Sequence, residues 1–254
     1  MSNPVLSEER WSQLRDVTNE SSNVMTVDGA ITKTGILLLV LLATIGLMWH
    51  TFWQGGAVDR AGMMPWLIGG VIGGLVLAII GMFAPRWAMF TGTLYAVAQG
   101  LVLGGVTMIF ESIKGYEGLA LTAAAFTAAT LIGMLLLYRT GVIRATPGLI
   151  KGIIMATAGL AIGMGILWLL SLFNIGSGIT ATLYGHGPIG IGFSVLCVGL
   201  AAFNWIVDFH VIEEGAKNGA PKYMEWVGAF GLLVTLVWLY IEILRLLAKL
   251  RSRD

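Results

Sequence analysis

The sequence has few charged residues for its length. Asp, Glu, Lys and Arg make up 11% of its 254 residues, whereas hydrophobic residues make up 57%. A soluble globular chain carries roughly 25% charged residues. This shortage excludes an ordinary soluble domain and predicts a polytopic membrane protein, whose first partner is the lipid bilayer. A formal net charge of +1 also leaves no basic surface of the kind that nucleic acid requires, so we expect no nucleic-acid binding.

Cysteine and histidine are also scarce. The single cysteine, Cys197, lies in an apolar run, which excludes a disulfide framework within the chain and predicts a small buried side chain. A haem-binding bundle would need facing histidines, but His50 and His210 fall at opposite ends of apolar runs. A retinal protein would need a lysine midway along a helix, and no run has one.

An intramembrane serine protease would need a buried serine beside a histidine. Ser177 and His186 share one Gly-rich loop, and Ser171 and Ser194 have no histidine placed near them. We therefore expect neither an enzyme nor a resident cofactor.

Long apolar runs are what the sequence does have. Residues Met1 to Asp28 are polar and lack a hydrophobic core of signal-peptide type, so we expect the first span to be retained. Seven later runs each reach the roughly 20 residues that a membrane-crossing helix needs. They are Thr34–Trp53, Met64–Ala84, Ala88–Phe110, Gly118–Tyr138, Ile150–Phe173, Pro188–Phe209 and Trp226–Leu247. The sequence predicts an all-α fold, with a polar tail at 1–28, seven transmembrane helices in 29–250 and a basic tail at 251–254.

Lys and Arg are unevenly distributed between the connections. With a cytoplasmic N-terminus, the outer loops hold only Arg60 and Lys114. The inner segments then hold Arg10, Arg15, Lys33, Arg86, Arg139, Arg144, Lys151, Lys217 and Lys222. Because cytoplasmic loops are enriched in these residues, the pattern predicts a cytoplasmic N-terminus. An odd helix count places the C-terminus outside, but Lys249, Arg251 and Arg253 argue against that side, so the side of the C-terminus stays open.

Many of the 35 glycines repeat at four-residue spacing. The pairs are Gly69 with Gly73, Gly70 with Gly74, Gly100 with Gly104 and Gly159 with Gly163. Such spacing lets helix backbones approach closely in lipid and predicts a tightly packed bundle.

Two apolar runs carry acidic residues. Asp208 lies near the end of the sixth run, and Glu242 lies in the second half of the seventh, followed by Arg245. An ionisable group within a span is costly and normally faces the protein interior. A close pair of carboxyl groups would share one proton, and in the ionised state it would offer the oxygen ligands that Ca²⁺ prefers. We predict a proton-sensitive ion site, and so a metal site, at Asp208 and Glu242. The alternatives are a solvent-wetted Asp208 at a helix end and an i,i+3 ion pair of Glu242 with Arg245.

Arg86 follows Pro85 in the shortest connection, on the side where Asp208 is expected. A guanidinium group there could pair with the acids and close a path. The simpler interpretation is a charge that marks the cytoplasmic side of the membrane.

Four segments resemble those of a known family. They are Asn204–Ile212 (NWIVDFHVI), Leu239–Leu247 (LYIEILRLL), Arg86 with Tyr95–Gly105, and Val24–Ala30 (VMTVDGA) with Lys33 and Thr34. The first two are similar to the tyrosine-aspartate segment and the leucine-tyrosine-leucine-aspartate motif of the Bax inhibitor, or transmembrane Bax-inhibitor-motif, family. The last resembles its bacterial branch related to the inner-membrane protein YccA. The likeness covers about residues 24–250.

The resemblance implies a seven-helix, pH-sensitive calcium leak of a bacterial inner membrane, with calcium as permeant ion. Acids on the last two helices would change protonation, and an arginine would help to hold the closed state. By position these residues are Asp208, Glu242 and Arg86. The sequence departs from the family in having Glu at 242 and a longer connection between the acids. The acids can meet only if the last span begins near Gly228 or Gly231, which we expect, because a start at Lys222 would place Glu242 about 30 Å along its helix.

A second function follows from the same branch. Members near YccA are thought to engage a membrane-bound ATP-dependent protease. The alternative is therefore a regulatory binding protein that acts on such a protease through its polar N-terminal tail, Met1 to Glu20.

Overall fold

Long helices make up nearly all of the computed structural model, which describes residues 23–54, 57–173 and 177–252. Seven helical stretches in these residues are long and apolar enough to cross a membrane, which confirms the predicted all-α fold. The long helices are α2 (Val27–Phe52), α3 (Arg60–Phe83), α4 (Ala88–Glu111), α5 (Leu119–Arg139), α6 (Pro147–Leu172), α8 (Pro188–Lys217) and α9 (Met224–Arg251). The connections contain a 3-10 turn, η2 (Pro85–Trp87), the short helix α7 (Ser177–Tyr184), and the antiparallel strands β1 (Trp53–Gln54) and β2 (Ala57–Val58).

Local capping residues set the starts of several helices. Thr26, Asp59 and Thr146 each accept a hydrogen bond from a backbone N–H in the first turn of α2, α3 and α6. Such side chains satisfy donors that have no partner within the helix. Pro147 and Pro188 open α6 and α8, where a missing N–H costs nothing. The cap at Thr26 starts α2 seven residues before the Thr34 expected from hydrophobicity.

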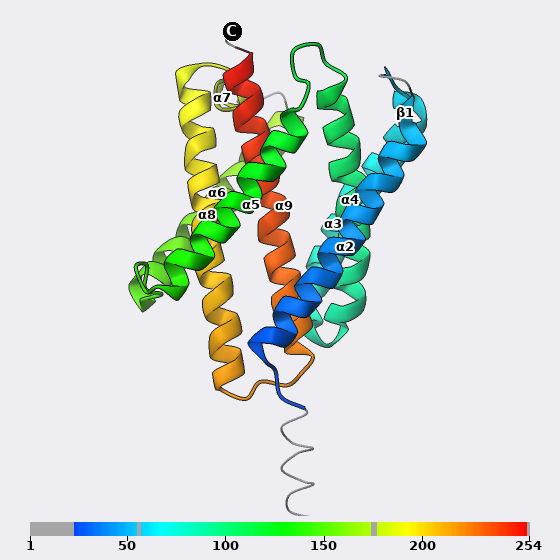
Figure 1. The fold of residues 1–254 in the computed structure, drawn as a ribbon. Coiled ribbons are helices and arrows are strands. Elements are labelled where there is room, and N and C mark those ends of the chain that lie inside the picture. Colours follow the sequence, from blue (N-terminus) through cyan, green and yellow to red (C-terminus); the bar gives the residue numbers. More distant parts are fainter. Residues whose placement is uncertain (1–22, 55–56, 174–176, 253–254) are drawn as a thin grey trace, which may run out of the picture.

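Helix α9 stands at the centre of the bundle. It packs against α2, α4, α5 and α8, whereas α3 packs mainly on α4 and α6 on α8. In Figure 1, α2, α3 and α4 lie on one side of α9, α6 and α8 lie on the other, and α5 crosses in front of α9. The most buried spans are α4 and α9, and the least buried is α6. The last helix therefore organises the contacts between the two halves.

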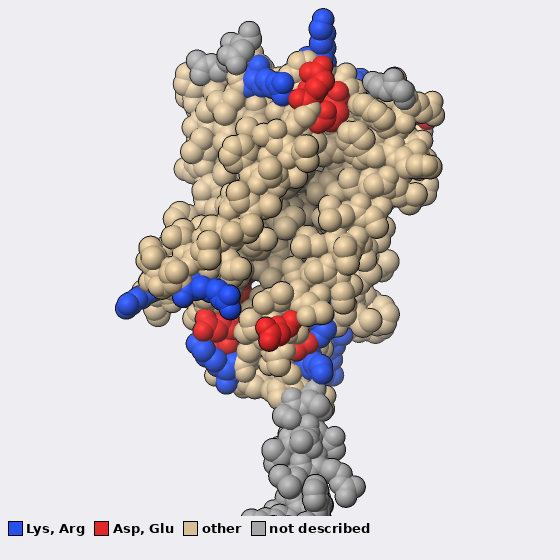
Figure 2. Space-filling view, in the orientation of Figure 1, with Lys and Arg blue, Asp and Glu red and all other residues tan. Residues whose placement is uncertain are grey.

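Charged side chains gather at the two ends of the molecule. Figure 2 shows Lys, Arg, Asp and Glu at the top and bottom of the face in view, with a broad band of other residues between them. This distribution suits a bilayer around the middle of the bundle. The start of α2 and the α8–α9 connection lie at one end, and the end of α9 lies at the other (Figure 1).

The glycine pairs divide into two kinds. A Cβ atom at Gly100 would lie 2.5 Å from the Cβ of Thr44, and one at Gly70 would lie 2.7 Å from the carbonyl oxygen of Ala98. Gly104 and Gly74 also meet neighbouring helices closely. Close packing is thus confirmed for α4 against α2 and α3. The prediction of close packing is wrong for the other two pairs, since Cβ atoms at Gly69, Gly73, Gly159 and Gly163 would meet nothing within 4 Å.

The structure corrects the boundaries of the last two spans. Helix α8 continues to Lys217, so Asp208 is an interior residue and not a helix-end residue. Helix α9 begins at Met224 and not near Gly228 or Gly231. The turn that follows Pro221 starts it early, because the N–H of Met224 already donates to the carbonyl of Pro221. Both corrections change where the two acids lie.

Candidate functional site

Asp208 lies half-buried in the interface between α8 and α9. Its Oδ2 accepts a hydrogen bond from the hydroxyl of Thr235 on α9, at 2.6 Å. A Cβ atom at Gly231, one turn earlier, would come within 3.9 Å of Oδ1, so the small residue leaves space beside the carboxylate. Trp205 lies one turn before Asp208 on α8, and its buried Nε1 has no hydrogen-bond partner among the described residues.

Glu242 does not face Asp208. Helices α8 and α9 run antiparallel, and the contacts Asp208 with Thr235 and Ser194 with Lys249 fix their register. Glu242 follows Thr235 by seven residues, which is about 10 Å along the helix at 1.5 Å per residue. The structure therefore does not bring the two carboxyl groups together in this arrangement, and no contact among the described residues supports a shared proton or a shared cation. The early start of α9 is the reason.

Glu242 is paired within its own helix. Its side chain is 8% exposed, and Nη1 of Arg245 lies 3.0 Å from Oε1 and 3.1 Å from Oε2. The i,i+3 ion pair considered as the alternative is thus confirmed. The Arg245 guanidinium also lies over the ring of Tyr184, 5.1 Å from its centroid, so the pair reaches the end of α7.

Lys249 is a buried residue and not part of a basic tail. Its Nζ donates to the carbonyls of Leu183 and Gly190 and to the hydroxyl of Ser194, each at 2.9 Å. An ammonium group has three donors and no acceptor, so all of its hydrogen bonds are made. Sequence reasoning treated Lys249 as a topology marker. Its spacing of four residues from Arg245 was the signal that could have placed the two cations on one face of α9.

The last turn of α9 is hydrogen-bonded to the connection that precedes α5. Nη1 of Arg251 donates to the carbonyl of Glu117 at 3.0 Å. The pKa of the Glu117 carboxyl is below its usual range, because the backbone N–H groups of Glu117 and Gly115 donate to it, with smaller contributions from Arg251 and Lys114. Arg253 lies outside the described residues.

Arg86 is exposed in η2, between α3 and α4. Figure 1 places this turn at the same end of the bundle as the α8–α9 connection. Among the described residues, its guanidinium makes no hydrogen bond or ion pair. The structure thus does not bring Arg86 to Asp208 in the contact expected of a closed state.

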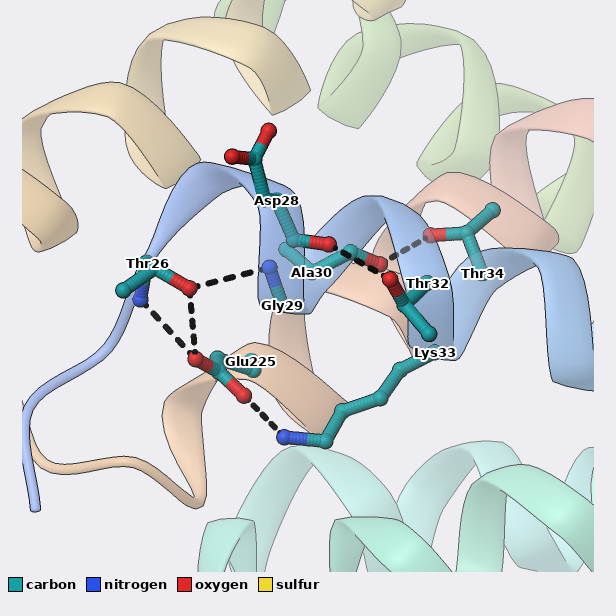
Figure 3. A network of polar contacts seen from close by, with 8 residues as sticks. All are labelled: Thr26, Asp28, Gly29, Ala30, Thr32, Lys33, Thr34 and Glu225. Atoms are coloured by element: carbon teal, nitrogen blue, oxygen red, sulfur yellow. Dashed lines mark hydrogen bonds and ion pairs between the residues drawn. The ribbon is translucent and has the colours of Figure 1, made fainter. Parts of the chain in front are cut away.

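A polar network that the sequence did not reveal ties the start of α2 to the start of α9 (Figure 3). Glu225 is 2% exposed. Its carboxylate accepts hydrogen bonds from the N–H and hydroxyl of Thr26, at 2.9 and 3.0 Å, and is paired with Lys33. A Cβ atom at Gly29 would lie 2.2 Å from Oε1 of Glu225, so a larger residue there would displace the carboxylate from its partners. In Figure 3 the Asp28 carboxylate points away from this network.

Backbone contacts complete the same junction. Val24 forms a β-bridge with Pro221, the N–H of Met25 donates to the carbonyl of Ala220, and that of Lys222 donates to the carbonyl of Asn23. The segment Val24–Ala30 and Lys33 thus have a structural role, because they form this junction. The residues Met1 to Glu20 considered as a protease-binding tail lie outside the described part of the chain.

No cluster of three or more His, Cys, Asp or Glu side chains that could hold a metal ion occurs in residues 23–54, 57–173 and 177–252. Asp208 and Glu242 are two separate carboxylates, the first hydrogen-bonded to Thr235 and the second paired with Arg245. A Ca²⁺ ion takes 6–8 oxygen ligands. At either position, most of those ligands would have to come from carbonyl groups, hydroxyl groups and water.

The comparisons with known proteins identify the family. The chain matches the family described as Bax inhibitor 1 like over residues 3–252. Neither the curated proteins nor the solved structures gave a match. Because the match spans nearly the whole sequence, the chain belongs to the Bax inhibitor 1-like family. It is an integral, multi-pass membrane protein with seven candidate spans.

Proposed function

We propose that this Bax inhibitor 1-like protein is a pH-dependent cation leak of a bacterial inner membrane, with calcium as the permeant ion and a cytoplasmic N-terminus. The observation that carries the proposal is Asp208, a carboxylate in the α8–α9 interface. Its hydrogen-bond partner among the described residues is the Thr235 hydroxyl, and no cation pairs with it there. An acid in a span without a paired cation is a typical mark of an ion or proton pathway.

A single acid with a hydroxyl partner replaces the coupled pair in this mechanism. Ionised Asp208 attracts a cation and supplies one hard oxygen ligand, to which the Thr235 hydroxyl can add a second. Protonated Asp208 has no charge to attract an ion and becomes a donor itself. The unpartnered indole N–H of Trp205, on the same face of α8, supports the presence of water beside the carboxylate. The cation flux should therefore rise with pH as Asp208 loses its proton.

Glu242 is a second ion ligand in this proposal, further along the same interface. Its carboxylate is neutralised by Arg245 in the present arrangement. A cation can use Glu242 only when Arg245 turns away, so Arg245 acts as the gating charge partner. Arg86 would gate only in a state in which its turn approaches the acids. We expect Arg86→Ala to leave the flux unchanged, and an increased leak would identify such a state.

The test is calcium flux into liposomes that contain a calcium-sensitive dye, measured across a range of pH. Asp208→Asn keeps the shape of the side chain and cannot titrate. It should abolish the rise in flux with pH and reduce flux at high pH by about tenfold, since it removes the charge from the interface. Asp28→Asn is the matched control, because Asp28 is an exposed acid at the same end of the bundle. If Asp208→Asn keeps the wild-type pH profile, the proposal is wrong.

The protease-binding function remains the alternative, and the junction of Thr26 with Glu225 makes it separable. Residues 23–26 are fastened to the α8–α9 connection, so a tail ahead of them would start from a fixed point. Deleting Met1 to Glu20 spares every contact of this junction. A leak should survive the deletion, whereas binding to a membrane-bound ATP-dependent protease through the tail should be lost.

A further inference from the structure

The end of α7 is held over the α8–α9 interface by cations of α9. Lys249 donates to the carbonyl of Leu183 in α7 and, with its other two N–H groups, to Gly190 and Ser194 in α8. One buried ammonium therefore joins three helices. Because the Leu183 carbonyl would lose its Lys249 partner if α7 moved away, the contact resists small displacements of α7.

A second contact places α7 close to the backbone of α8. A Cβ atom at Gly190 would lie 2.1 Å from the carbonyl oxygen of Gly185 and 3.0 Å from that of Thr182. Glycine at position 190 is thus what permits the chain after α7 to lie against the first turn of α8. By contrast, a Cβ atom at Gly192, two residues later, would meet nothing within 4 Å.

The third contact connects α7 with Glu242. Tyr184, the last residue of α7, lies against the guanidinium of Arg245, and the same guanidinium binds the Glu242 carboxylate. Arg245 cannot leave Glu242 toward α7 while Tyr184 occupies that side. The position of α7 therefore determines whether Glu242 can exchange its partner.

We propose that α7 is a lid, latched by Lys249 and Arg245, which closes the C-terminal end of the α8–α9 interface over Glu242. Displacing α7 releases the Tyr184 ring from Arg245 and admits water to the face of α8 that contains Ser194 and Cys197. The regulatory role of this lid depends on the proposed function, because it assumes that Glu242 lines the ion path. The lid itself can be tested without any measurement of flux.

Cys197 is a natural reporter for this movement. It is the only cysteine of the chain and is 2% exposed. It lies one turn beyond Ser194 on α8, on the face that contacts Lys249. A charged thiosulfonate reagent reacts with a thiol that water reaches and not with one packed against α9. Labelling of Cys197 therefore measures how often the lid is displaced.

The experiment compares Gly190→Ala with Gly192→Ala in nanodiscs, where the reagent reaches both faces of the membrane. Gly190→Ala places a methyl group against the Gly185 carbonyl, so α7 must move. Labelling should become faster by about tenfold or more, as expected when overpacking forces a backbone shift. Gly192→Ala gains the same helix-favouring methyl group in open space and should label at the wild-type rate. Tyr184→Ala, which removes the ring from Arg245 and leaves Gly190 intact, should also accelerate labelling.

The outcomes separate the two proposals. Unchanged labelling in both Gly190→Ala and Tyr184→Ala would overturn the lid, whatever the calcium flux does. Faster labelling with unchanged flux would establish the lid and contradict a role for Glu242 in conduction. Faster labelling together with an increased flux is the result that we expect.

Discussion

At the scale of single residues, the partner of each acid decides how that acid can act. Asp208 meets a hydroxyl, Glu242 meets Arg245, and Glu225 meets Lys33 with Thr26. Two of these three acids are neutralised by a cation, which is the usual condition for a buried carboxylate. Asp208 is the exception, and it is therefore the residue to which we assign the proposed proton- or ion-dependent function.

The Asp208–Thr235 hydrogen bond should contribute measurably to stability. Thr235→Val keeps the shape of the side chain and removes the donor, so Asp208 loses its described partner. We expect a loss of about 1–3 kcal/mol, the usual cost of an unsatisfied buried polar group, measured as a lower midpoint of thermal unfolding in detergent. Thr122→Val is the control, since Thr122 is exposed on α5 and its hydroxyl donates to its own helix at Gly118. Equal midpoints for the two variants would show that the hydrogen bond contributes nothing.

Gly29 should be the least replaceable residue at the junction of α2 and α9. Gly29→Ala would place its methyl group on the Glu225 carboxylate and separate it from Thr26, at a cost of about 1–3 kcal/mol for overpacking. Gly35→Ala, in the same helix, has no neighbour within 4 Å and should be neutral or stabilising by up to about 1 kcal/mol. Unfolding midpoints in detergent compare the two. If Gly29→Ala is as stable as Gly35→Ala, the junction does not support the fold.

At the scale of helices, α4 and α6 show opposite uses of glycine. In α4, Gly100 and Gly104 allow the backbone of α2 to approach, which is how helices associate in lipid without a hydrophobic driving force. In α6, Gly159 and Gly163 meet no other part of the described chain. The same four-residue spacing therefore marks a contact in one helix and an open face in the other.

This difference predicts unequal effects of the same substitution. Gly100→Ala should destabilise the bundle by about 1–3 kcal/mol, because its methyl group would overlap Thr44 and the carbonyl of Leu41. Gly159→Ala should raise stability slightly, since alanine favours helix by about 1 kcal/mol over glycine. Chemical unfolding in mixed micelles would measure both. A Gly159→Ala variant that is the less stable of the two would mean that α6 packs against something other than lipid.

At the scale of the whole molecule, seven candidate spans predict that the start of α2 and the end of α9 lie on opposite sides of the membrane. The number of basic residues near the C-terminus argues against this arrangement. Lys249 is buried and Arg251 donates to Glu117, so neither is a free charge that would hold the end of α9 in the cytoplasm. The objection to an external C-terminus is therefore weaker than the count of basic residues suggested.

Fusions of alkaline phosphatase, which is active only outside the cytoplasm, test the orientation. We expect an active fusion after Arg251 and an inactive one at Asn218 in the α8–α9 connection, because α9 crosses the membrane between them. The fusion after Arg251 should be about tenfold more active than the fusion at Asn218, because the positive-inside rule then places the two sites on opposite sides of the membrane. Equal activity at the two sites would mean that α9 does not cross the membrane.

Several properties of this protein are determined by the sequence alone. The spans follow from run length and hydrophobicity, which are local, so the number and order of the spans were predicted correctly. The motifs around Asp208 and Glu242 indicated the family that the match over residues 3–252 confirmed. Glycine spacing predicted close packing, but only two of the four pairs provide it, because spacing does not say which face of a helix meets a neighbour.

The tertiary structure alone decided which polar groups meet. Thr26 and Glu225 are 199 residues apart in sequence, and Lys249 binds a carbonyl 66 residues before it. The partner of Asp208 depends on the turn that starts α9 at Met224, since the start of a helix sets its register against the preceding one. The hydrophobicity of the two runs does not indicate the register of α9 against α8. For this reason the sequence located Asp208 and Glu242 but not their partners, and it did not indicate that Lys249 and Glu225 are buried.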